Sequence, residues 1–257
     1  MIVSIIKEIA ESLIRNFHLL SSKNKKCVKE ITSGLKSDGI SIEKNFYTKD
    51  QCSKLISRID DMISSKSAKV WVDDEASDHR IYFVNEIDES FNEFYEDHKV
   101  RQVLSSYTGT EHPKGMLLAA KIEFKEGNEG SGGGWHRDSP YTHQFKAICY
   151  LNDVNEDNGP FQYIKGSQSK VNVLKNYYNK IFSPGQYRFN ETDIDIYLEK
   201  NNKEITTVTG EAGSLVFADT KGIHRGKPLK SGCRYVLFCY FWHKSIPAHF
   251  NELKQTE

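Results

Sequence analysis

The sequence predicts a mainly β fold with flanking helices. From residue 117 onward, short segments rich in β-branched and aromatic residues are separated by Gly, Asn, Pro and Asp turns. About six to eight strands without intervening long helices predict a sandwich or a barrel and not a parallel doubly wound sheet. The predicted strands are MLLAAKIEF, FKAICYL, PFQYI, EITTVTG, SLVFADT and CRYVLFCYF.

Residues 1–110 are predicted to be mainly helix and loop. The N-terminal segment MIVSIIKEIAESLIRNFHLL places apolar residues at the spacing of an amphipathic helix, and a second helix is expected after SSKNKK. GISIEKNF, at 39–46, predicts a short strand. Thr48 is expected to cap a helix whose apolar positions run to Ile63.

Two further segments complete this flank. Residues 67–85, which include DDEASDHRIYF, mix charged and aromatic residues and predict an ordered loop. Residues 91–109 return to helical spacing, and Gly109 is expected to end that helix.

The chain of 257 residues is long enough for one large β domain, and we expect a single domain over 1–257. The strand-rich core is predicted at 111–245. Within it, 169–204 is a tyrosine- and asparagine-rich insertion that is expected to contain helix and loop. It is longer than a structural connection requires, so it is either a lid over a site or a surface addition.

Composition limits the class of protein. Lys plus Arg and Asp plus Glu number 35 each, which argues against a chain-wide basic surface for nucleic acid or for an anionic membrane. The five cysteines form no CxxC pair, which argues against a disulfide scaffold or a zinc ribbon. Charged residues interrupt the N-terminal apolar segment, so neither a signal peptide nor a membrane span is expected. We therefore expect a cytoplasmic protein of undetermined oligomeric state.

The strongest motif is WHRD, which follows the glycine-rich stretch EGNEGSGGG. His136 and Asp138 are two residues apart, so on an extended segment both side chains point to the same face. Of the later histidines, His224 is the best third ligand because it lies between the strands SLVFAD and CRYVLFCYF. Two histidines and one carboxylate on one face of a metal form the facial triad of non-haem Fe(II) oxygenases.

Arg234 opens the apolar strand CRYVLFCYF, ten residues after His224. A guanidinium that points into an apolar barrel requires an anion, because an isolated buried charge costs several kcal/mol. A dicarboxylate cosubstrate would supply that anion. The alternative is that Arg234 faces solvent or pairs with a structural carboxylate.

Together these motifs resemble the phytanoyl-CoA dioxygenase-like family of Fe(II)/2-oxoglutarate-dependent oxygenases. WHRD resembles the WHxD motif of that family, and NDVNEDNGPFQYIKGSQSK resembles its acidic loop, NGP strand and following turn. GISIEKNFYTKDQCSKLISRID resembles its N-terminal strand and helix. The likeness extends over about residues 38–245 and implies a double-stranded β-helix, also called a jelly roll or cupin-like barrel.

The resemblance implies Fe(II) bound by His136, Asp138 and His224, with 2-oxoglutarate and O2 as cosubstrates. Arg234 would bind the far carboxylate of 2-oxoglutarate. The implied reaction is hydroxylation of a C–H bond in a small or carrier-linked metabolite, with release of succinate and CO2. Related halogenases lack the carboxylate ligand, whereas Asp138 is present here.

Further residues are candidates for contacts in the same site. Lys121 and Tyr150 lie in predicted strands and are candidate cofactor-binding residues. Candidate substrate contacts come from the metal motif and from the charged segment before residue 85, and they are Trp135, Tyr141, Arg80 and Tyr82.

Two other classes stay open at this level. One is a cupin-type metalloenzyme without 2-oxoglutarate, or a zinc hydrolase with the same ligands, although no HxH of the cupin kind is present. The other is a jelly-roll binding module without catalysis, which would have no need of His136, Asp138, His224 and Arg234 together.

Overall fold

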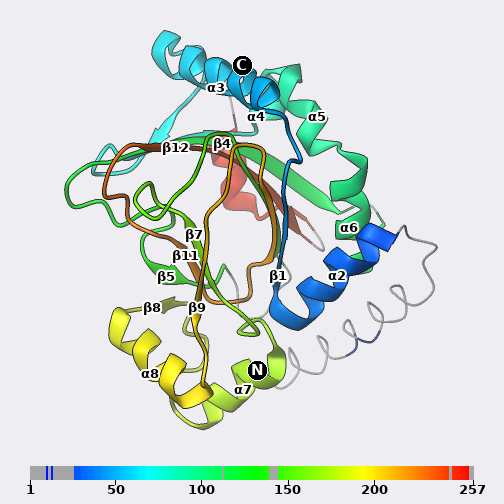
Figure 1. Ribbon diagram of the computed structural model, residues 1–257, viewed down its shortest axis with the longest axis vertical. Helices are drawn as coiled ribbons and strands as arrows, with labels where there is room; N and C mark the ends of the chain where they lie inside the picture. Colours follow the sequence, from blue (N-terminus) through cyan, green and yellow to red (C-terminus); the bar gives the residue numbers. More distant parts are fainter. Residues whose placement is uncertain are drawn as a thin grey trace.

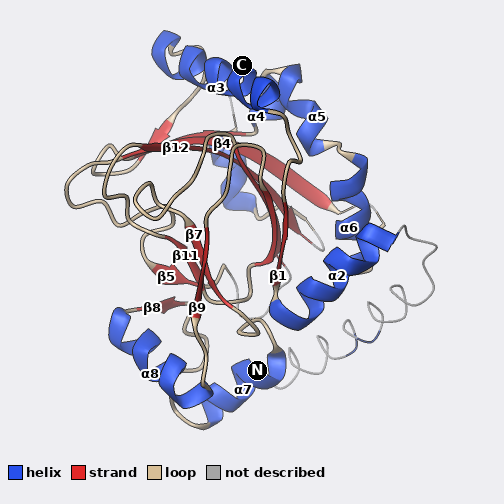
Figure 2. Ribbon diagram, viewed as in Figure 1, coloured by secondary structure: helices blue, strands red, loops and turns tan. Residues whose placement is uncertain are grey.

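Two antiparallel β-sheets lie face to face, with helices on the outside (Figures 1 and 2). This arrangement confirms the predicted mainly β fold class. The predicted N-terminal helix falls outside the described residues except for two positions. The computed structural model describes Ala10, Leu13 and residues 26–111, 113–138, 144–242 and 245–254.

The larger sheet has seven strands in the order β1-β10-β6-β12-β4-β3-β2. Its two longest strands, β4 and β12, pair from Cys233 opposite Glu123 to Trp242 opposite Lys114. The strands of this sheet are β1 (Ile40–Glu43), β2 (Trp71–Val72), β3 (Asp78–Tyr82), β4 (Lys114–Glu123), β6 (Gln144–Tyr150), β10 (Leu215–Asp219) and β12 (Cys233–Trp242).

The smaller sheet has five strands in the order β8-β5-β11-β7-β9. Its members are short, and three of them have only two or three residues. The strands are β5 (Trp135–His136), β7 (Phe161–Ile164), β8 (Arg188–Phe189), β9 (Ile205–Val208) and β11 (His224–Gly226).

Most helices of the N-terminal part pack on the outer face of the larger sheet (Figure 1). The predicted cap of α3 is confirmed, because the Thr48 side chain accepts from the Gln51 N–H. No helix among the described residues is long and apolar enough to cross a membrane. The helices are α2 (Lys26–Asp38), α3 (Lys49–Ser65), α4 (Val84–Ile87), α5 (Asn92–Tyr95), α6 (His98–Thr108), α7 (Lys170–Tyr178) and α8 (Glu191–Asn201), with 3-10 turns η1 (Glu89–Phe91) and η2 (Ala248–Leu253).

Alternation along β12 divides the protein into two apolar layers. Tyr235, Leu237 and Phe241 belong to the cluster that packs against the helices. Val236 and Phe238 belong to the cluster between the sheets, as period-two alternation requires. Arg234 follows the same alternation as these inner residues and is also buried. The functional cavity therefore forms between the sheets, where apolar and charged side chains meet.

The insertion at 169–204 becomes part of the smaller sheet. It contains α7 and α8, as helix and loop were predicted, and it also supplies β8, which pairs with β5. Phe182, Phe189 and Tyr197 of the insertion pack around Trp135 in a third buried cluster. Figure 1 shows α7 and α8 together at the end of the molecule that carries β8 and β9.

Two local predictions differ from the structure. The loop predicted at 67–85 contains β2 and β3, and β3 tolerates charge because Arg80 pairs with Asp78 inside the sheet. The helix predicted at 91–109 is interrupted after Tyr95, since Asp97 caps a new helix by accepting from the Val100 N–H at 2.8 Å. Its predicted end is confirmed, because Gly109 lies in the left-handed region at φ 67°.

Candidate metal and cosubstrate site

The two short strands β5 and β11 bring three metal-ligand types together. His136 ends β5 and His224 begins β11, and the two residues are direct partners across the sheet. Asp138 follows two residues after His136, with its Oδ1 3.6 Å from His136 Nε2 and 3.8 Å from His224 Nε2. One potential ligand atom from each residue lies within 4.8 Å of the others.

Each histidine is oriented by its own chain. The Nδ1 of His136 is 2.9 Å from the Gly134 carbonyl oxygen, and the Nδ1 of His224 is 2.9 Å from the Gly222 carbonyl oxygen. A carbonyl only accepts, so each Nδ1 donates and each Nε2 keeps its lone pair free for a cation. This is the outer-shell contact that metal-binding histidines usually make.

The donor set fits a divalent metal. His224 is buried, and its Nε2 has no hydrogen-bond partner among the described residues. Burial holds the pKa of His224 well below its usual range, and the nearby His136 acts in the same direction. A buried neutral imidazole with an unused lone pair, beside a second imidazole and a carboxylate, is what a non-haem Fe(II) site requires.

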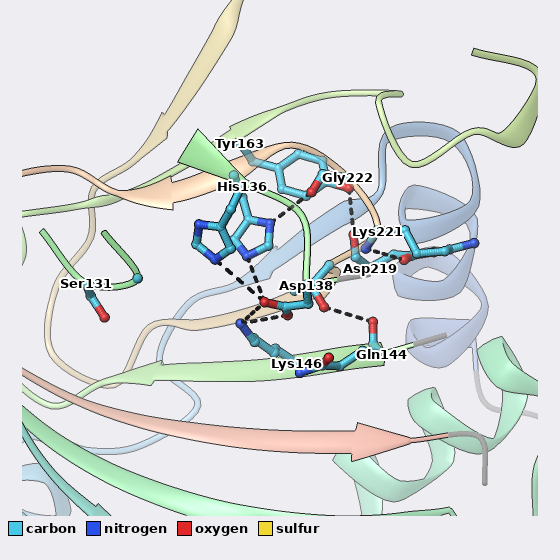
Figure 3. A network of polar contacts seen from close by, with 12 residues as sticks. Ser131, His136, Asp138, Gln144, Lys146, Tyr163, Asp219, Lys221 and Gly222 are labelled. Atoms are coloured by element: carbon cyan, nitrogen blue, oxygen red, sulfur yellow. Dashed lines mark hydrogen bonds and ion pairs between the residues drawn. The ribbon is translucent and has the colours of Figure 1, made fainter. Parts of the chain in front are cut away.

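Lys146 holds the carboxylate of Asp138, the third candidate ligand. Its Nζ lies 2.8 Å from Asp138 Oδ2 and 3.1 Å from Oδ1 (Figure 3). Burial alone would raise the pKa of Asp138, but the charge of Lys146 outweighs burial and keeps that pKa well below its usual range. Asp138 is therefore an anion in the folded protein, as metal binding requires.

The glycine-rich stretch allows the main chain to pack closely against the ring of His136. Gly132 has φ +92°, and a Cβ at this position would lie 2.5 Å from Cε1 of His136. A Cβ added to Gly226 of β11 would lie 2.9 Å from the Cβ of Ser131 in the same turn. The turn thus backs the His136 ring with main chain, which only glycine permits at this distance.

The three candidate ligands, His136, Asp138 and His224, line a cavity of about 390 Å³ between the two sheets. Its walls combine the triad and charged side chains with an aromatic surface from β12 and η2. Besides the triad, the lining residues include Arg80, Tyr82, Gly132, Arg137, Lys146, Tyr150, Arg188, Arg234, Tyr240, Trp242, His249 and Phe250.

Arg234 lies in this cavity as a buried cation. Only 2% of it is exposed, its Nε has no hydrogen-bond partner, and no carboxylate among the described residues forms an ion pair with it. Burial lowers the pKa of the Arg234 guanidinium. An unpaired buried guanidinium is costly, so an incoming carboxylate would be bound strongly.

Comparison with known families identifies the chain. Residues 35–235 match the profile of the phytanoyl-CoA dioxygenase (PhyH) family. The chain belongs to this family. It is therefore an oxygenase that depends on Fe(II) and 2-oxoglutarate and uses O2.

Solved structures share the phytanoyl-CoA dioxygenase fold at low sequence identity. The epimerase SnoN from nogalamycin biosynthesis, in complex with Fe3+, alpha ketoglutarate and nogalamycin RO, has a TM-score of 0.65 at 12% identity over 90% of each chain. HygX from Streptomyces hygroscopicus, with nickel and 2-oxoglutarate bound, has a TM-score of 0.59 at 10% identity over 89% of this chain and 94% of HygX. EctD from S. alaskensis with bound Fe has a TM-score of 0.61 at 14% identity over 82% of this chain and 75% of EctD. No curated protein sequence matches the chain.

Besides the triad and Arg234, three residues predicted to contact cosubstrate or substrate line the cavity, namely Arg80, Tyr82 and Tyr150. Arg80 donates from Nε to Asp78 at 3.0 Å and from Nη2 to Ser131 at 3.1 Å, and Tyr82 lies further along the same strand. Tyr150 also lines the cavity, but its hydroxyl donates to the Val208 carbonyl and accepts from the Phe161 N–H. Its ring can form part of the cosubstrate wall, whereas its only O–H is already used.

Lys121 and Trp135 lie elsewhere. Lys121 is on the outer face of β4, where its Nζ is 3.1 Å from Asp60 and 3.4 Å from Glu123. Trp135 points to the opposite face from His136, is buried, and stacks under the Arg225 guanidinium at 4.3 Å. Neither side chain reaches the cavity, and Tyr141 lies outside the described residues.

Sequence reasoning missed Lys146 and Arg188. Lys146 is the only charged residue of the strand QFKAICY, and an isolated charge in such a strand is a usable signal for a buried partner. Arg188 lies in the insertion, and its position depends on the pairing of β8 with β5, which local sequence does not specify.

Proposed function

We propose that this protein hydroxylates a C–H bond of a small molecule, free or attached to a carrier, with release of succinate and CO2. One oxygen atom of O2 would enter the substrate and the other would enter succinate. The observation that carries the proposal is the buried, unpartnered Nε2 of His224 facing His136 Nε2 and the Asp138 carboxylate.

Each site residue receives a role in this proposal. His136, Asp138 and His224 would hold Fe(II), and Arg234 would bind the far carboxylate of 2-oxoglutarate. When bound, the metal and 2-oxoglutarate supply O2 activation and oxidation of the substrate. Lys146 holds Asp138, which favours ligation through one carboxylate oxygen, and the aromatic wall excludes water from the cavity.

Hydroxylation is proposed over halogenation because Asp138 supplies a third protein ligand and leaves no further place for a halide. SnoN and SnoK are described as an epimerase and a carbocyclase, so the outcome of the reaction differs among proteins of this fold. The alternative of a binding module without catalysis does not account for the unpartnered His224 or for the unpaired Arg234.

We further propose that the chain works as one domain in the cytoplasm. The insertion supports a single domain because it adds a strand to the smaller sheet and shares a buried cluster with Trp135. All five cysteines are free thiols, which suits a reducing compartment.

An anaerobic titration with Fe(II) and 2-oxoglutarate tests the proposed site. The wild-type protein is expected to develop the weak visible charge-transfer band of an Fe(II)–keto acid chelate. His224→Ala should show no band, and His249→Ala is the matched control because His249 lines the same cavity outside the triad. Loss of the band in the control alone, or an unchanged band in His224→Ala, would refute the ligand assignment.

Substrate hydroxylation is tested separately. Candidate compounds that stimulate succinate release would be incubated under ¹⁸O₂, and the product would be analysed by mass spectrometry. Incorporation of one labelled oxygen into the product supports hydroxylation. A product that lacks two hydrogens and carries no label would replace hydroxylation with desaturation or ring closure.

A further inference from the structure

The cavity carries an excess of positive charge. Among the described residues, its lining includes five cationic side chains and one carboxylate, that of Asp138. Asp138 is paired with Lys146, and Arg80 is paired with Asp78 next to the cavity. Three arginines therefore have no carboxylate partner among the described residues, and they are Arg137, Arg188 and Arg234.

The metal and cosubstrate do not remove this excess. Fe(II) contributes two positive charges and 2-oxoglutarate contributes two negative charges, so together they leave the balance unchanged. Arg234 is assigned to 2-oxoglutarate in the proposed function. Arg137 points to the face opposite His136 and Asp138, toward the Phe189 ring at 5.8 Å. Arg188 is thus the cation left to face a substrate.

Arg188 is placed beside the metal ligands by strand pairing. It is the direct partner of His136 across β8 and β5, so the two side chains stand on the same face of the sheet. Its Nη1 donates to the carbonyl oxygens of Gly132 and Gly133, each at 2.9 Å. Arg188 lines the cavity and is exposed to solvent, so these contacts hold the guanidinium where the cavity meets solvent. Its hydrogen bonds to the described residues are made by Nη1, which leaves Nε and Nη2 for an incoming group.

An aromatic surface forms another part of the cavity wall. The Tyr240 and Trp242 rings stack with centroids 6.0 Å apart, and Phe250 lies 5.2 Å from Trp242. Phe250 also lies 6.3 Å from Tyr82. These four rings come from β12, η2 and β3, and they define an apolar surface suited to a flat or bulky organic group.

We infer that the substrate carries an anionic group, a carboxylate or a phosphate, on an apolar body. Arg188 binds the anion beside His136, and the aromatic surface of Tyr240, Trp242 and Phe250 binds the body. This inference rests on the proposed function, because it places the substrate next to the metal and to 2-oxoglutarate. The insertion at 169–204 would then contribute to substrate selection, because it supplies Arg188.

The test uses three probes that share a phenyl ring and differ in charge, namely phenylacetate, phenyl phosphate and neutral phenylacetamide. The protein is loaded with Mn(II) and saturating 2-oxoglutarate, and paramagnetic broadening of each probe's proton signals is measured by NMR against a Zn(II)-loaded reference. Dissociation constants are obtained by titration. Wild-type protein should broaden and bind an anionic probe about tenfold more tightly than phenylacetamide, as expected for a charged hydrogen bond.

Arg188→Met should remove the preference for the anionic probe, and Arg188→Lys should retain part of it because the charge is kept without the planar fork. Lys200→Met is the matched control, since Lys200 is an exposed cation of α8 in the same insertion and does not line the cavity. It should behave as wild type. The relative affinities of phenylacetate and phenyl phosphate decide between carboxylate and phosphate.

The outcomes separate this inference from the proposed function. If Mn(II) does not broaden the 2-oxoglutarate signals of the wild-type complex, the proposed function fails, and the inference fails with it. If 2-oxoglutarate is broadened but the three probes bind equally, or Arg188→Met keeps the preference, only the inference is overturned. Weakened 2-oxoglutarate binding in Arg188→Met would also overturn it, because Arg188 would then serve the cosubstrate.

Discussion

The Lys146 ammonium lies within 3.1 Å of both oxygens of Asp138, one of the three residues that form the candidate metal centre. Both side chains are almost completely removed from solvent, at 7% and 13% exposure. Without a metal, Lys146 is the main counter-charge of Asp138. With a metal, the carboxylate is shared between the two cations, so Lys146 affects both the stability of the metal-free protein and the orientation of the ligand.

Replacement of Lys146 by Met should destabilise the metal-free protein by about 3 kcal/mol, because it leaves a buried carboxylate without its partner. A bound divalent metal should restore more stability to Lys146→Met than it adds to the wild type, since the metal then neutralises Asp138. Thermal unfolding with and without Zn(II) measures both effects. Lys121→Met is the control, because Lys121 pairs with the partly exposed Asp60 and should cost less than about 1 kcal/mol. Equal metal-induced stabilisation in Lys146→Met and wild type would contradict this role of Lys146.

Two glycines of the turn before β5 form a matched pair. Gly132 and Gly134 both have positive φ, so alanine at either position should cost about 1–2 kcal/mol of backbone strain. Only at Gly132 would the new Cβ meet the His136 ring, at 2.5 Å, whereas nothing lies within 4 Å at Gly134. Gly132→Ala should therefore weaken metal binding and Gly134→Ala should not, as measured by isothermal titration with Zn(II). Equal metal affinities in the two variants would show that the ring contact is unimportant.

Replacement of Arg234 by Met should have opposite effects on stability and on cosubstrate binding. The metal-free protein should become more stable by about 1 kcal/mol or more, because an unpaired buried charge is exchanged for an apolar side chain of similar length. The affinity for 2-oxoglutarate should fall by about 100-fold or more, because its carboxylate loses its cationic partner. Thermal unfolding and calorimetric titration measure the two quantities. A destabilised variant with normal 2-oxoglutarate affinity would mean that Arg234 has a structural role instead.

The metal-free protein should lose stability in mild acid. Burial keeps the pKa of His224 well below its ordinary value, so the unfolded chain takes up a proton near pH 6.5 that the folded chain does not accept. The contribution is therefore complete above about pH 6.5 and is lost as the pH falls, at about 1.4 kcal/mol per pH unit for one proton. Urea unfolding at about pH 7.5 and about pH 5.5 measures this slope. His224→Gln should have a smaller slope, and an identical slope would assign the effect to other groups.

The triad was accessible from sequence because its geometry is mostly local. Two-residue spacing places His136 and Asp138 on one face of an extended segment, and the strands on either side of His224 bring it to the same region. The same alternation turns Trp135, the neighbour of His136, away from the cavity. Arg234 was predicted inward because β12 alternates clearly around it.

Other positions could not be predicted because they depend on long-range pairing. The strand around Lys121 is apolar on both faces, so its sequence carries no alternation that tells the inner face from the outer one. Its side chain turned out to pair with Asp60 of α3. Arg188 enters the site only because β8, which has two residues, adds to the edge of the smaller sheet beside β5. No local pattern specifies such a short edge strand.

The position of Phe250 in the chain separates part of the aromatic surface from the candidate metal ligands. The rings of Tyr240 and Trp242 lie on β12, and their contacts with Phe250 depend on η2 folding back over that strand. The candidate ligands lie on β5, β11 and the residues just after β5, outside η2. Displacement of η2 from β12 would therefore open this side of the cavity without moving a candidate metal ligand.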